Sequence, residues 1–372
     1  MSLSHRVLLL LVMLFATAPP GSALAAQEEP EYPTPEKIEE AKNAPLFTSH
    51  DLINLTLTAD FRSLSREDRD PEEDSEERPA TLEWIGADGM TNIQDIMIST
   101  RGNFRLSRRN CDFPPLRLNI KKGEVKGTLF EIQDKIKLVS PCKLKQDYWQ
   151  QYVLSEYLVY RMLNLLTSWS FRVRLAEITY IDETGEEETF SRYAFLIEDD
   201  SELAKRNASV KWEWQGGQLN PVLLDKPYAI LVEFFQYMIG NTDWSGPGLH
   251  NMELLRDANG KPFTVPFDFD FSGIVDARYA VPDQSLSIRS VRDRDFRGYC
   301  PDQMGRQPDQ YQGVIELFQE KREEIYGLWQ AQEGLDEDRV KDTIEYLDDF
   351  FEILDDPDKV QREILDQCVR IG

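Results

Sequence analysis

Histidine is scarce in this chain, and several common catalytic motifs are missing. Only three histidines occur, at positions 5, 50 and 250. There is no His-Glu-x-x-His and no Gly-x-Ser-x-Gly, so the chain lacks the motifs of ordinary zinc proteases and of α/β-hydrolases. The chain also lacks a Gly-x-Gly-x-x-Gly loop and an Asp-Phe-Gly triplet. No Cys-x-x-Cys pair is present, which favours structural disulfides over metal or redox chemistry for the cysteines.

Positive charge is also in short supply. Lys and Arg number 42 and Asp and Glu number 67 in 372 residues, so the formal net charge is −25. Such an acidic protein repels phosphates, and we therefore expect no duplex nucleic acid among its partners. The hydrophobic share of 41% excludes disorder of the whole chain and is sufficient for the cores of two lobes.

Long apolar runs are absent apart from a short one near the N-terminus. Arg6 precedes a 12-residue apolar run, and Ala23-Leu24-Ala25 follows it. This pattern is typical of a secretory signal peptide, here residues 1–25. The run is too short to span a bilayer. We therefore expect export to the periplasm or secretion, with no membrane span after cleavage; an uncleaved anchor is the alternative.

The remaining chain divides into a β-rich first half and a helical second half. An acidic, proline-bearing, disordered leader is expected over 26–45 and a charged loop over 67–78. Alternating or β-branched patterns predict strands at residues 52–57, 80–85, 93–99, 116–120, 135–139, 173–181, 193–197, 252–255 and 265–271. Helical spacing of apolar residues predicts helices at 147–166, 227–239, 314–329, 338–354 and 359–369. The fold class is therefore α+β.

Four cysteines suit an oxidising compartment and allow two disulfides in any of three connectivities. If the strands at 116–120 and 135–139 form an antiparallel hairpin, Cys111 and Cys142 lie almost symmetrically about its turn near Val125. We therefore predict a Cys111–Cys142 disulfide, which leaves Cys300 to pair with Cys368.

The segment 101–146 reverses the charge of the chain. It holds twelve basic residues and four acids, a net charge of +8. This reversal indicates a binding site for an anion, although a solvated basic surface would have the same composition.

Glu156 falls on the apolar stripe of the expected helix 147–166, so this helix turns an acid inward. A buried carboxylate costs several kcal/mol unless it is paired. Lys137, on the strand 135–139, is the expected partner, and alternation places Lys135 on the same face as Lys137. A local hydrogen bond to Glu156 is the structural alternative.

Two polar segments follow the helix 227–239. The first holds Asp243 and Asn251, in a loop between a helix and a strand where catalytic residues often lie; an ordinary polar turn is the alternative. The second is 265–271, where Asp268 and Asp270 alternate with phenylalanines. Strand alternation would put both carboxylates on one face, where a cation relieves their repulsion. A solvent-facing acidic strand edge is the alternative.

This ordered set matches the requirements of phosphoryl transfer. A lysine oriented by a glutamate neutralises phosphates, a loop aspartate accepts the hydroxyl proton, and an asparagine and a final aspartate hold magnesium. A metal-dependent phosphohydrolase using Asp268 and Asp270 is a further alternative, but no histidine or third clustered acid completes a two-metal site.

The stretch from Arg101 to Asp270 resembles the spore-coat CotH family of secreted, atypical protein-kinase-like proteins. The matching segments are Arg101-Gly102-Asn103, Ile136-Lys137-Leu138, Phe195-Leu196-Ile197-Glu198, Asn241-x-Asp243 with Asn251, and Pro266-Phe267-Asp268-Phe269-Asp270-Phe271. The resemblance covers roughly half of the chain. It implies a kinase-like fold with a β-rich N-lobe over 46–200 and a helical C-lobe over 201–372.

The resemblance also implies site roles and ligands. Lys137 and Glu156 would form the ion pair, with Asp243 as the base. Asn251 and Asp268 would hold Mg²⁺ or Mn²⁺, assisted by Asp270. ATP or a related nucleotide would be bound by Arg101, Asn103, Lys135, Lys137 and Glu198. A protein would accept the phosphate, and the acidic C-terminal helices suit a basic protein partner. The competing expectation is a catalytically inactive kinase-fold interaction module of the periplasm or cell surface.

Overall fold

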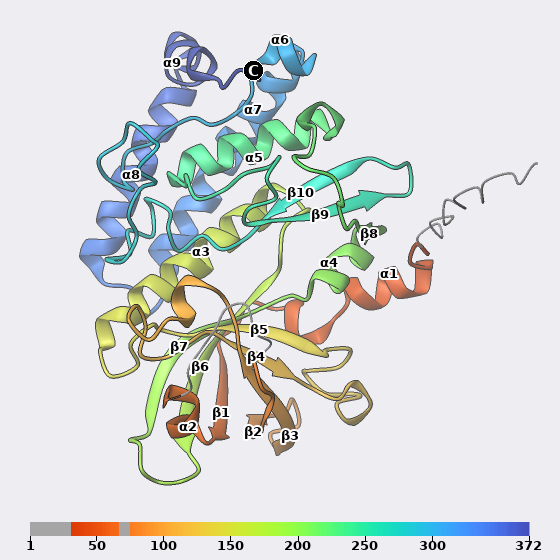
Figure 1. Cartoon of the computed structure of the whole chain (residues 1–372), viewed down its shortest axis with the longest axis vertical. Helices are drawn as coiled ribbons and strands as arrows, with labels where there is room; N and C mark the ends of the chain where they lie inside the picture. The colour runs from red at the N-terminus through yellow and green to blue at the C-terminus, as the bar shows by residue number, and fades with distance from the viewer. Residues whose placement is uncertain (1–30, 67–74, 372) are drawn as a thin grey trace, which may run out of the picture. The chain divides into compact units, whose positions relative to one another are not determined.

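The computed structural model describes residues 31–66 and 75–371, so the expected signal peptide and most of the expected charged loop lie outside the described residues. Tyr32–Gly372 form one compact unit. Its first half contains a closed β-barrel with strand order β1-β2-β3-β4-β5-β7-β6 (Figure 1). The barrel strands are β1 (Ile53–Ala59), β2 (Arg78–Ile85), β3 (Thr91–Thr100), β4 (Leu116–Asn119), β5 (Lys135–Val139), β6 (Val173–Asp182) and β7 (Phe190–Ile197).

The barrel closes through one parallel pair. β1 pairs with β6 in parallel, and every other neighbouring pair is antiparallel. Alternation sends one face of each strand inward, so that Leu55, Leu57, Leu82 and Leu138 are at most 2% exposed. The apolar side chains inside the barrel form one hydrophobic core.

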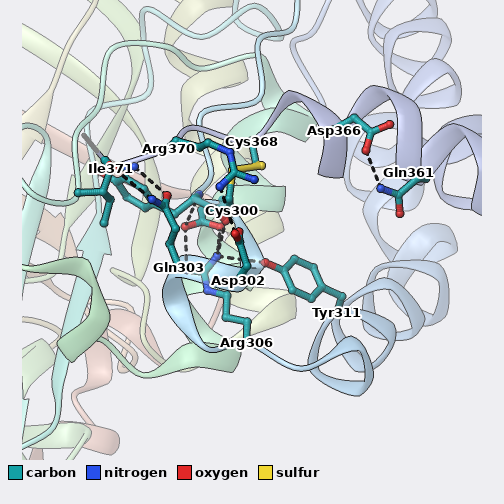
Figure 2. Close-up of a disulfide and its surroundings, with 12 residues drawn as sticks. Cys300, Asp302, Gln303, Arg306, Tyr311, Gln361, Asp366, Cys368, Arg370 and Ile371 are labelled. Atoms are coloured by element: carbon teal, nitrogen blue, oxygen red, sulfur yellow. Dashed lines mark hydrogen bonds and ion pairs between the residues drawn. A yellow bond between two sulfur atoms is a disulfide. The ribbon is translucent and has the colours of Figure 1, made fainter.

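The predicted hairpin and both predicted disulfides are confirmed. Leu116 lies opposite Leu138 in the antiparallel β4–β5 pair. Beyond that end of the hairpin, Cys111 and Cys142 form a disulfide with a Cα–Cα distance of 4.7 Å. Cys300 and Cys368 form the second disulfide, which ties the end of the chain to the segment before α6 (Figure 2). Both bonds fit an oxidising compartment.

Helices and a small second sheet make up most of the rest. The helices are α1 (Pro35–Lys42), α2 (Phe61–Arg66), α3 (Gln150–Leu166), α4 (Asp200–Arg206), α5 (Lys226–Ile239), α6 (Pro301–Met304), α7 (Pro308–Ala331), α8 (Glu337–Leu354) and α9 (Pro357–Glu363). Short 3₁₀ helices lie at Pro45–Phe47, Phe104–Leu106, Lys122–Glu124, Asp147–Trp149, Pro221–Leu223 and Leu365–Gln367. The second sheet has the order β10-β9-β8, with β8 (Ser209–Lys211), β9 (Met252–Asp257) and β10 (Pro262–Pro266). A mixed α+β fold is therefore confirmed.

The helix α3 joins the two halves of the fold. Nearly all of its side chains are buried, because it contacts β7 on one side and α7 on another (Figure 1). The second hydrophobic core combines α3, α5, α7 and α8 with the outward-facing side chains Val173, Leu175 and Phe195 of the barrel. α3 thus carries its buried polar residues between the barrel and the helices.

Three expectations about local structure are wrong. The expected disordered leader, 26–45, contains α1, whose Ala41 is fully buried. The expected strand 265–271 ends at Pro266, because Asp268 adopts a left-handed conformation with φ of 63° that a strand cannot contain. The expected last helix, 359–369, is instead α9, which begins two residues earlier and ends at Glu363. None of the helices within residues 31–66 and 75–371 is long and apolar enough to cross a membrane.

Candidate functional site

The inward acid of α3 is at the centre of the candidate site. Glu156 is 2% exposed, as its position on the apolar stripe predicted. Its Oε2 lies 3.9 Å from Nη1 of Arg105, which follows β3 and also donates a hydrogen bond to the carbonyl of Ser140. Burial raises the pKa of Glu156 well above its ordinary value, the neighbouring Asp270 and Asp268 raise it further, and Arg105 opposes them.

The expected ion pair between Lys137 and Glu156 is wrong. The ammonium of Lys137 lies 2.5 Å from Oδ1 of Asp200 in α4. The reason is the register of the barrel: Lys137 faces Ile197 of β7, and the chain turns into α4 only three residues later. Asp200 therefore reaches Lys137 on the outer face of β5, and Arg105 takes the place beside Glu156.

Lys137 belongs to a charged cluster on the outer face of the barrel. Asp200 also accepts a bond of 3.1 Å from Lys211, which lies 3.2 Å from Glu253. The ammonium of Lys137 is 5.5 Å from the ring centre of Phe267, the residue before Asp268. This contact keeps Lys137 close to the second aspartate segment. Lys135, at the start of the same strand, is exposed.

The Arg101-Gly102-Asn103 segment directly follows β3 and leads to the 3₁₀ helix that carries Arg105. Gly102 has φ of 89°, a conformation that glycine adopts without strain. Arg101 interacts electrostatically with Asp268 and with Glu156, and its Nε is buried without a hydrogen-bond partner. Asn103 is exposed. Arg101 therefore places a positive charge beside the carboxylates of Asp268 and Glu156.

The segment ending in Arg105 also packs on the second aspartate segment. The ring of Phe104 lies 5.1 Å from that of Phe271 and 5.6 Å from that of Tyr279. Tyr279 in turn donates its hydroxyl hydrogen to Asp270 over 2.9 Å. The predicted anion-binding and carboxylate segments are therefore in contact.

The loop after α5 holds the predicted base. α5 ends at Ile239 and is capped by Gly240, which has φ of 63° and packs so closely that a Cβ atom would lie 2.1 Å from the hydroxyl of Tyr346. The amide of Asn251 donates to the carbonyl oxygen of Asp243 at 2.8 Å and to its carboxylate at 3.2 Å. His250 Nε2 lies 2.9 Å from the other carboxylate oxygen. The Asp243 side chain is 43% exposed, so a substrate can reach it.

The two aspartates after β10 occupy different environments. The backbone N–H of Phe267 donates to the carbonyl of Asn251 at 3.1 Å, which places Asp268 next to the loop. The backbone N–H of Asp268 donates to the hydroxyl of Tyr160, one turn after Glu156 on α3. Asp268 is exposed and Asp270 is 4% exposed. The two carboxylates interact electrostatically without sharing the face of a strand.

The donor atoms suit magnesium better than zinc. Mg²⁺ is bound through one or two carboxylates together with substrate phosphates and water. Asp268 and Asp270 offer carboxylate oxygens, and Asn251 offers its side-chain oxygen, because its nitrogen already donates to Asp243. Within the described residues there is no group of three or more His, Cys, Asp or Glu side chains arranged to hold a metal ion. Phosphate oxygens would therefore have to complete the coordination.

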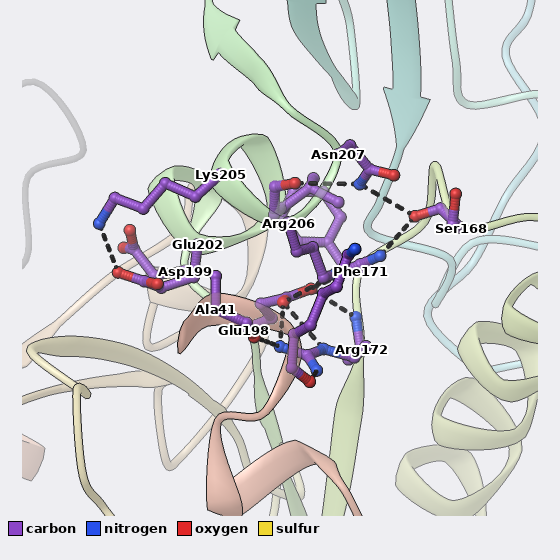
Figure 3. A network of polar contacts seen from close by, with 12 residues as sticks. Ala41, Ser168, Phe171, Arg172, Glu198, Asp199, Glu202, Lys205, Arg206 and Asn207 are labelled. Carbon is purple, nitrogen blue, oxygen red and sulfur yellow. Dashed lines mark hydrogen bonds and ion pairs between the residues drawn. The ribbon is translucent and has the colours of Figure 1, made fainter. Parts of the chain in front are cut away.

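Glu198 is a structural residue, and the expectation that its side chain binds a cofactor is wrong. The side chain is fully buried, and its carboxylate accepts hydrogen bonds from Arg172 and Arg206 over 2.9 to 3.1 Å (Figure 3). Arg172 also donates to the carbonyl oxygens of Ala41 and Lys42 in α1. Two arginines occupy the carboxylate, so no ligand can reach it.

Sequence reasoning missed four polar neighbours in this region: Arg105, Asp200, His250 and Tyr279. The first two form ion pairs with predicted site residues, and the last two hydrogen bond to predicted aspartates. The sequence holds a signal for two of the four residues. Arg105 lies four residues after Arg101 in the basic block, and His250 directly precedes Asn251.

Comparison with known proteins gives no further identification. A scan against protein-family models finds no family that matches this chain, and a search of curated proteins finds no significant match.

The buried Asp270 should make stability depend on pH. Burial, and secondly Asp268, raise its pKa to about 7. The unfolded chain loses this proton near pH 4, so the folded state becomes less stable as pH rises from about 4 through 7. Asp270→Asn, which can still accept the hydrogen bond from Tyr279, should therefore be more stable than the wild type at pH 8, by at most about 4 kcal/mol, and equal to it near pH 4.

Urea denaturation between pH 4 and 8 measures this difference. The matched control is Asp276→Asn, which changes the same charge at an exposed position in the following segment. A difference between Asp270→Asn and the wild type that stays constant with pH would contradict the prediction.

Proposed function

We propose that this protein is an exported, kinase-like phosphotransferase that binds a nucleotide with Mg²⁺ and transfers phosphate to a protein. The observation that carries the proposal is the pairing of Asn251 with both the carbonyl and the carboxylate of Asp243. A backbone hydrogen bond from Phe267 to Asn251 then brings Asp268 beside them. A base and two candidate metal ligands thus meet at one exposed place.

The architecture supports the same proposal. In kinase-like folds a β-rich lobe carries the phosphate-neutralising cation, and a helix from that lobe presents a glutamate to the site. Here the barrel and α3 supply these parts, while α5, β9 and β10 supply the loops with the base and the final aspartate. The chain order of these parts agrees with their order in protein kinases.

Each residue has a defined task in this proposal. Asp243 accepts the proton of the attacking hydroxyl and holds that hydroxyl in line, while Asn251 fixes the orientation of its carboxylate. Arg101 supplies positive charge for phosphate oxygens, and Glu156 and Arg105 hold that arginine segment in place. Lys137, beside Phe267, adds a second positive charge, and Asn103 and Lys135 contact phosphate from their exposed positions.

Asn251, Asp268 and Asp270 would hold magnesium. The ion, when bound, would neutralise charge on the transferring phosphate and orient it. Asp268, which is exposed, and the buried Asp270, which accepts a hydrogen bond from Tyr279, supply the negative charge that would attract the ion.

The proposal is tested by melting the mature chain with ATP, GTP and ADP, each with and without Mg²⁺ or Mn²⁺, and by following radioactive phosphate transfer to the chain itself and to a basic protein. A ligand present at 100 times its Kd stabilises the folded state by about 2.7 kcal/mol, so binding should raise the melting temperature by several degrees. We expect a nucleotide to raise the melting temperature only when the metal is also present. We also expect radioactive phosphate to be transferred to the chain or to the basic protein.

The second candidate function is an interaction module that has the kinase-like arrangement without the reaction. Two departures from the kinase pattern favour this candidate: Lys137 pairs with Asp200 rather than with Glu156, and the chain has no Gly-x-Gly-x-x-Gly loop. The acidic C-terminal segment, with fourteen acids and four bases over 333–367, suits a basic partner under either function. Metal-dependent nucleotide binding without any transfer would favour the module. No shift in melting temperature with any nucleotide or metal would contradict the phosphotransferase and the roles assigned to Asp243 and Asp268, because the kinase-like site would then be vestigial.

A further inference from the structure

A cavity of about 390 Å³ opens at one end of the barrel, where β1 and β6 end and β7 begins. It is formed by residues outside the candidate site described above. Its volume is within the range of small-molecule and side-chain binding sites, which are typically lined by apolar and aromatic groups with a few polar ones. The chemistry of its lining therefore indicates what it would bind.

Four aromatic side chains line the cavity: Phe61, Phe113, Tyr180 and Phe190. The ring of Tyr180 lies 5.7 Å from that of Phe61 and 5.3 Å from that of Phe113. The Tyr180 hydroxyl shares a hydrogen bond of 2.8 Å with Ser140, so this hydroxyl already has a partner within the protein. Clustered ring faces attract cations as well as apolar groups.

The charged residues of the lining are mostly acidic. Asp112, Asp182, Glu187 and Glu188 line the cavity together with only two basic residues, Arg108 and Lys145. Lys145 lies 3.3 Å from Glu187, so these two charges largely compensate each other. The lining therefore carries a net negative charge, which attracts a cation and disfavours an anion.

One of these acids is buried and held in its ionised form. Asp182 is 6% exposed. Burial raises its pKa, but hydrogen bonds from the Thr184 hydroxyl and from the backbone N–H groups of Arg62 and Glu187 lower it more, so the net shift is downward. Asp182 thus supplies a fixed negative charge in the lining of the cavity.

The cavity is preformed rather than assembled around a ligand. Asp112 and Phe113 follow Cys111, and Leu144 and Lys145 follow Cys142, so the Cys111–Cys142 disulfide joins two of its walls. The backbone N–H of Phe113 also donates to the carbonyl of Cys142 at 3.1 Å. Fixed walls lower the entropic cost of binding.

We propose that this cavity binds the cationic side chain of a lysine or arginine in a basic polypeptide segment. The aliphatic stem of the side chain would pack among the rings, and its charged end would lie beside the carboxylates. The chain's net charge of −25 would favour the approach of such a segment. This proposal does not rest on the proposed phosphotransferase function.

Leucine methyl NMR tests it, because Leu144 lines the cavity. The mature chain, labelled at leucine methyl groups, is titrated with the capped tripeptide Gly-Lys-Gly, with the same peptide carrying norleucine, and with Gly-Glu-Gly. Norleucine keeps the stem of lysine and removes its charge. We expect the lysine peptide to shift the Leu144 signals with an affinity at least about fivefold higher than that of the norleucine peptide.

Two variants identify the groups responsible. Asp112→Asn with Glu188→Gln removes two exposed charges and should weaken binding of the lysine peptide by about fivefold. Phe190→Leu removes a ring and should weaken the lysine peptide more than the norleucine peptide. The matched control, Asp338→Asn with Glu345→Gln, removes two charges on α8 and should leave binding unchanged.

Three outcomes would overturn the proposal. The lysine peptide could bind no more tightly than the norleucine peptide or than the glutamate peptide. Alternatively, the α8 variant could weaken binding of the lysine peptide as much as the cavity variant does. The last outcome would assign the attraction to the net charge of the whole protein. Absence of any Leu144 shift with the lysine peptide would also overturn it.

Discussion

Replacing Glu198 with glutamine should lower the free energy of unfolding by about 3–5 kcal/mol, because it removes the fully buried counter-ion of two largely buried guanidinium groups. Arg172 and Arg206 both donate to the Glu198 carboxylate (Figure 3). Glutamine has the same shape but only one acceptor oxygen, and its amide hydrogens would face the guanidinium donors. Guanidinium chloride denaturation, followed by circular dichroism with the disulfides intact, measures the loss.

The matched control is Glu345→Gln, which makes the same substitution at a side chain that is 68% exposed on α8. A surface change of this kind should alter stability by no more than about 0.5 kcal/mol. Limited proteolysis gives a second readout, because Arg172 also holds the carbonyl oxygens at the end of α1. Trypsin should cut after Lys42 faster in Glu198→Gln than in the control. Equal stability of the two variants would contradict the structural role of Glu198.

The individual strands of the barrel could be predicted well from the sequence because the evidence for each strand is local. Alternation within each strand decides which side chains enter the core, and the expected strands match β1 to β7 to within a few residues. The Cys111–Cys142 disulfide followed from the symmetry of a single hairpin. The buried position of Glu156 followed from the helical spacing of its neighbours. Each of these predictions used information from one continuous segment.

The errors arose where two distant segments had to be placed together. Lys137 and Glu156 were correctly placed on a strand and on a helix, but no pattern in the sequence revealed that β7 lies next to β5 and delivers Asp200 to Lys137. The order of strands in a barrel depends on all of its strands at once, so a partner across it cannot be chosen from spacing alone. Glu198 was misjudged for the same reason, since Arg172 and Arg206 reach it only in the folded chain.

Local backbone geometry explains the other error at the site. Alternation places Asp268 and Asp270 on one face only while the chain remains extended, and the left-handed conformation of Asp268 ends that regularity. Aspartate adopts this conformation more readily than most residues, but nothing in a single sequence marks where it does so. The consequence is functional, because one carboxylate is exposed while the other is buried against Tyr279.

Asp243→Asn and Asp268→Asn should fail in different ways if the proposed function is correct. Asp243 lies on the loop that an attacking hydroxyl would reach, so its replacement should lower phosphate transfer by about 10²–10⁴-fold and leave metal-dependent nucleotide binding within about twofold. Asp268→Asn removes a charge that would hold the metal, so binding itself should lose its dependence on Mg²⁺. Asparagine is chosen at position 268 because alanine would be strained at a φ of 63°.

Two measurements on the same preparations separate these outcomes: nucleotide affinity by calorimetry with and without Mg²⁺, and single-turnover phosphate transfer at saturating nucleotide. Asp276→Asn is the matched control, since it makes the same change at an exposed aspartate that also has a left-handed backbone, with φ of 46°. It should change neither quantity. If Asp243→Asn and Asp268→Asn lose binding to the same extent, Asp243 acts as a ligand for the metal rather than as a base. If both variants retain the wild-type rate of transfer, the reaction takes place elsewhere on the protein, because a site that depends on these carboxylates cannot work without their charge.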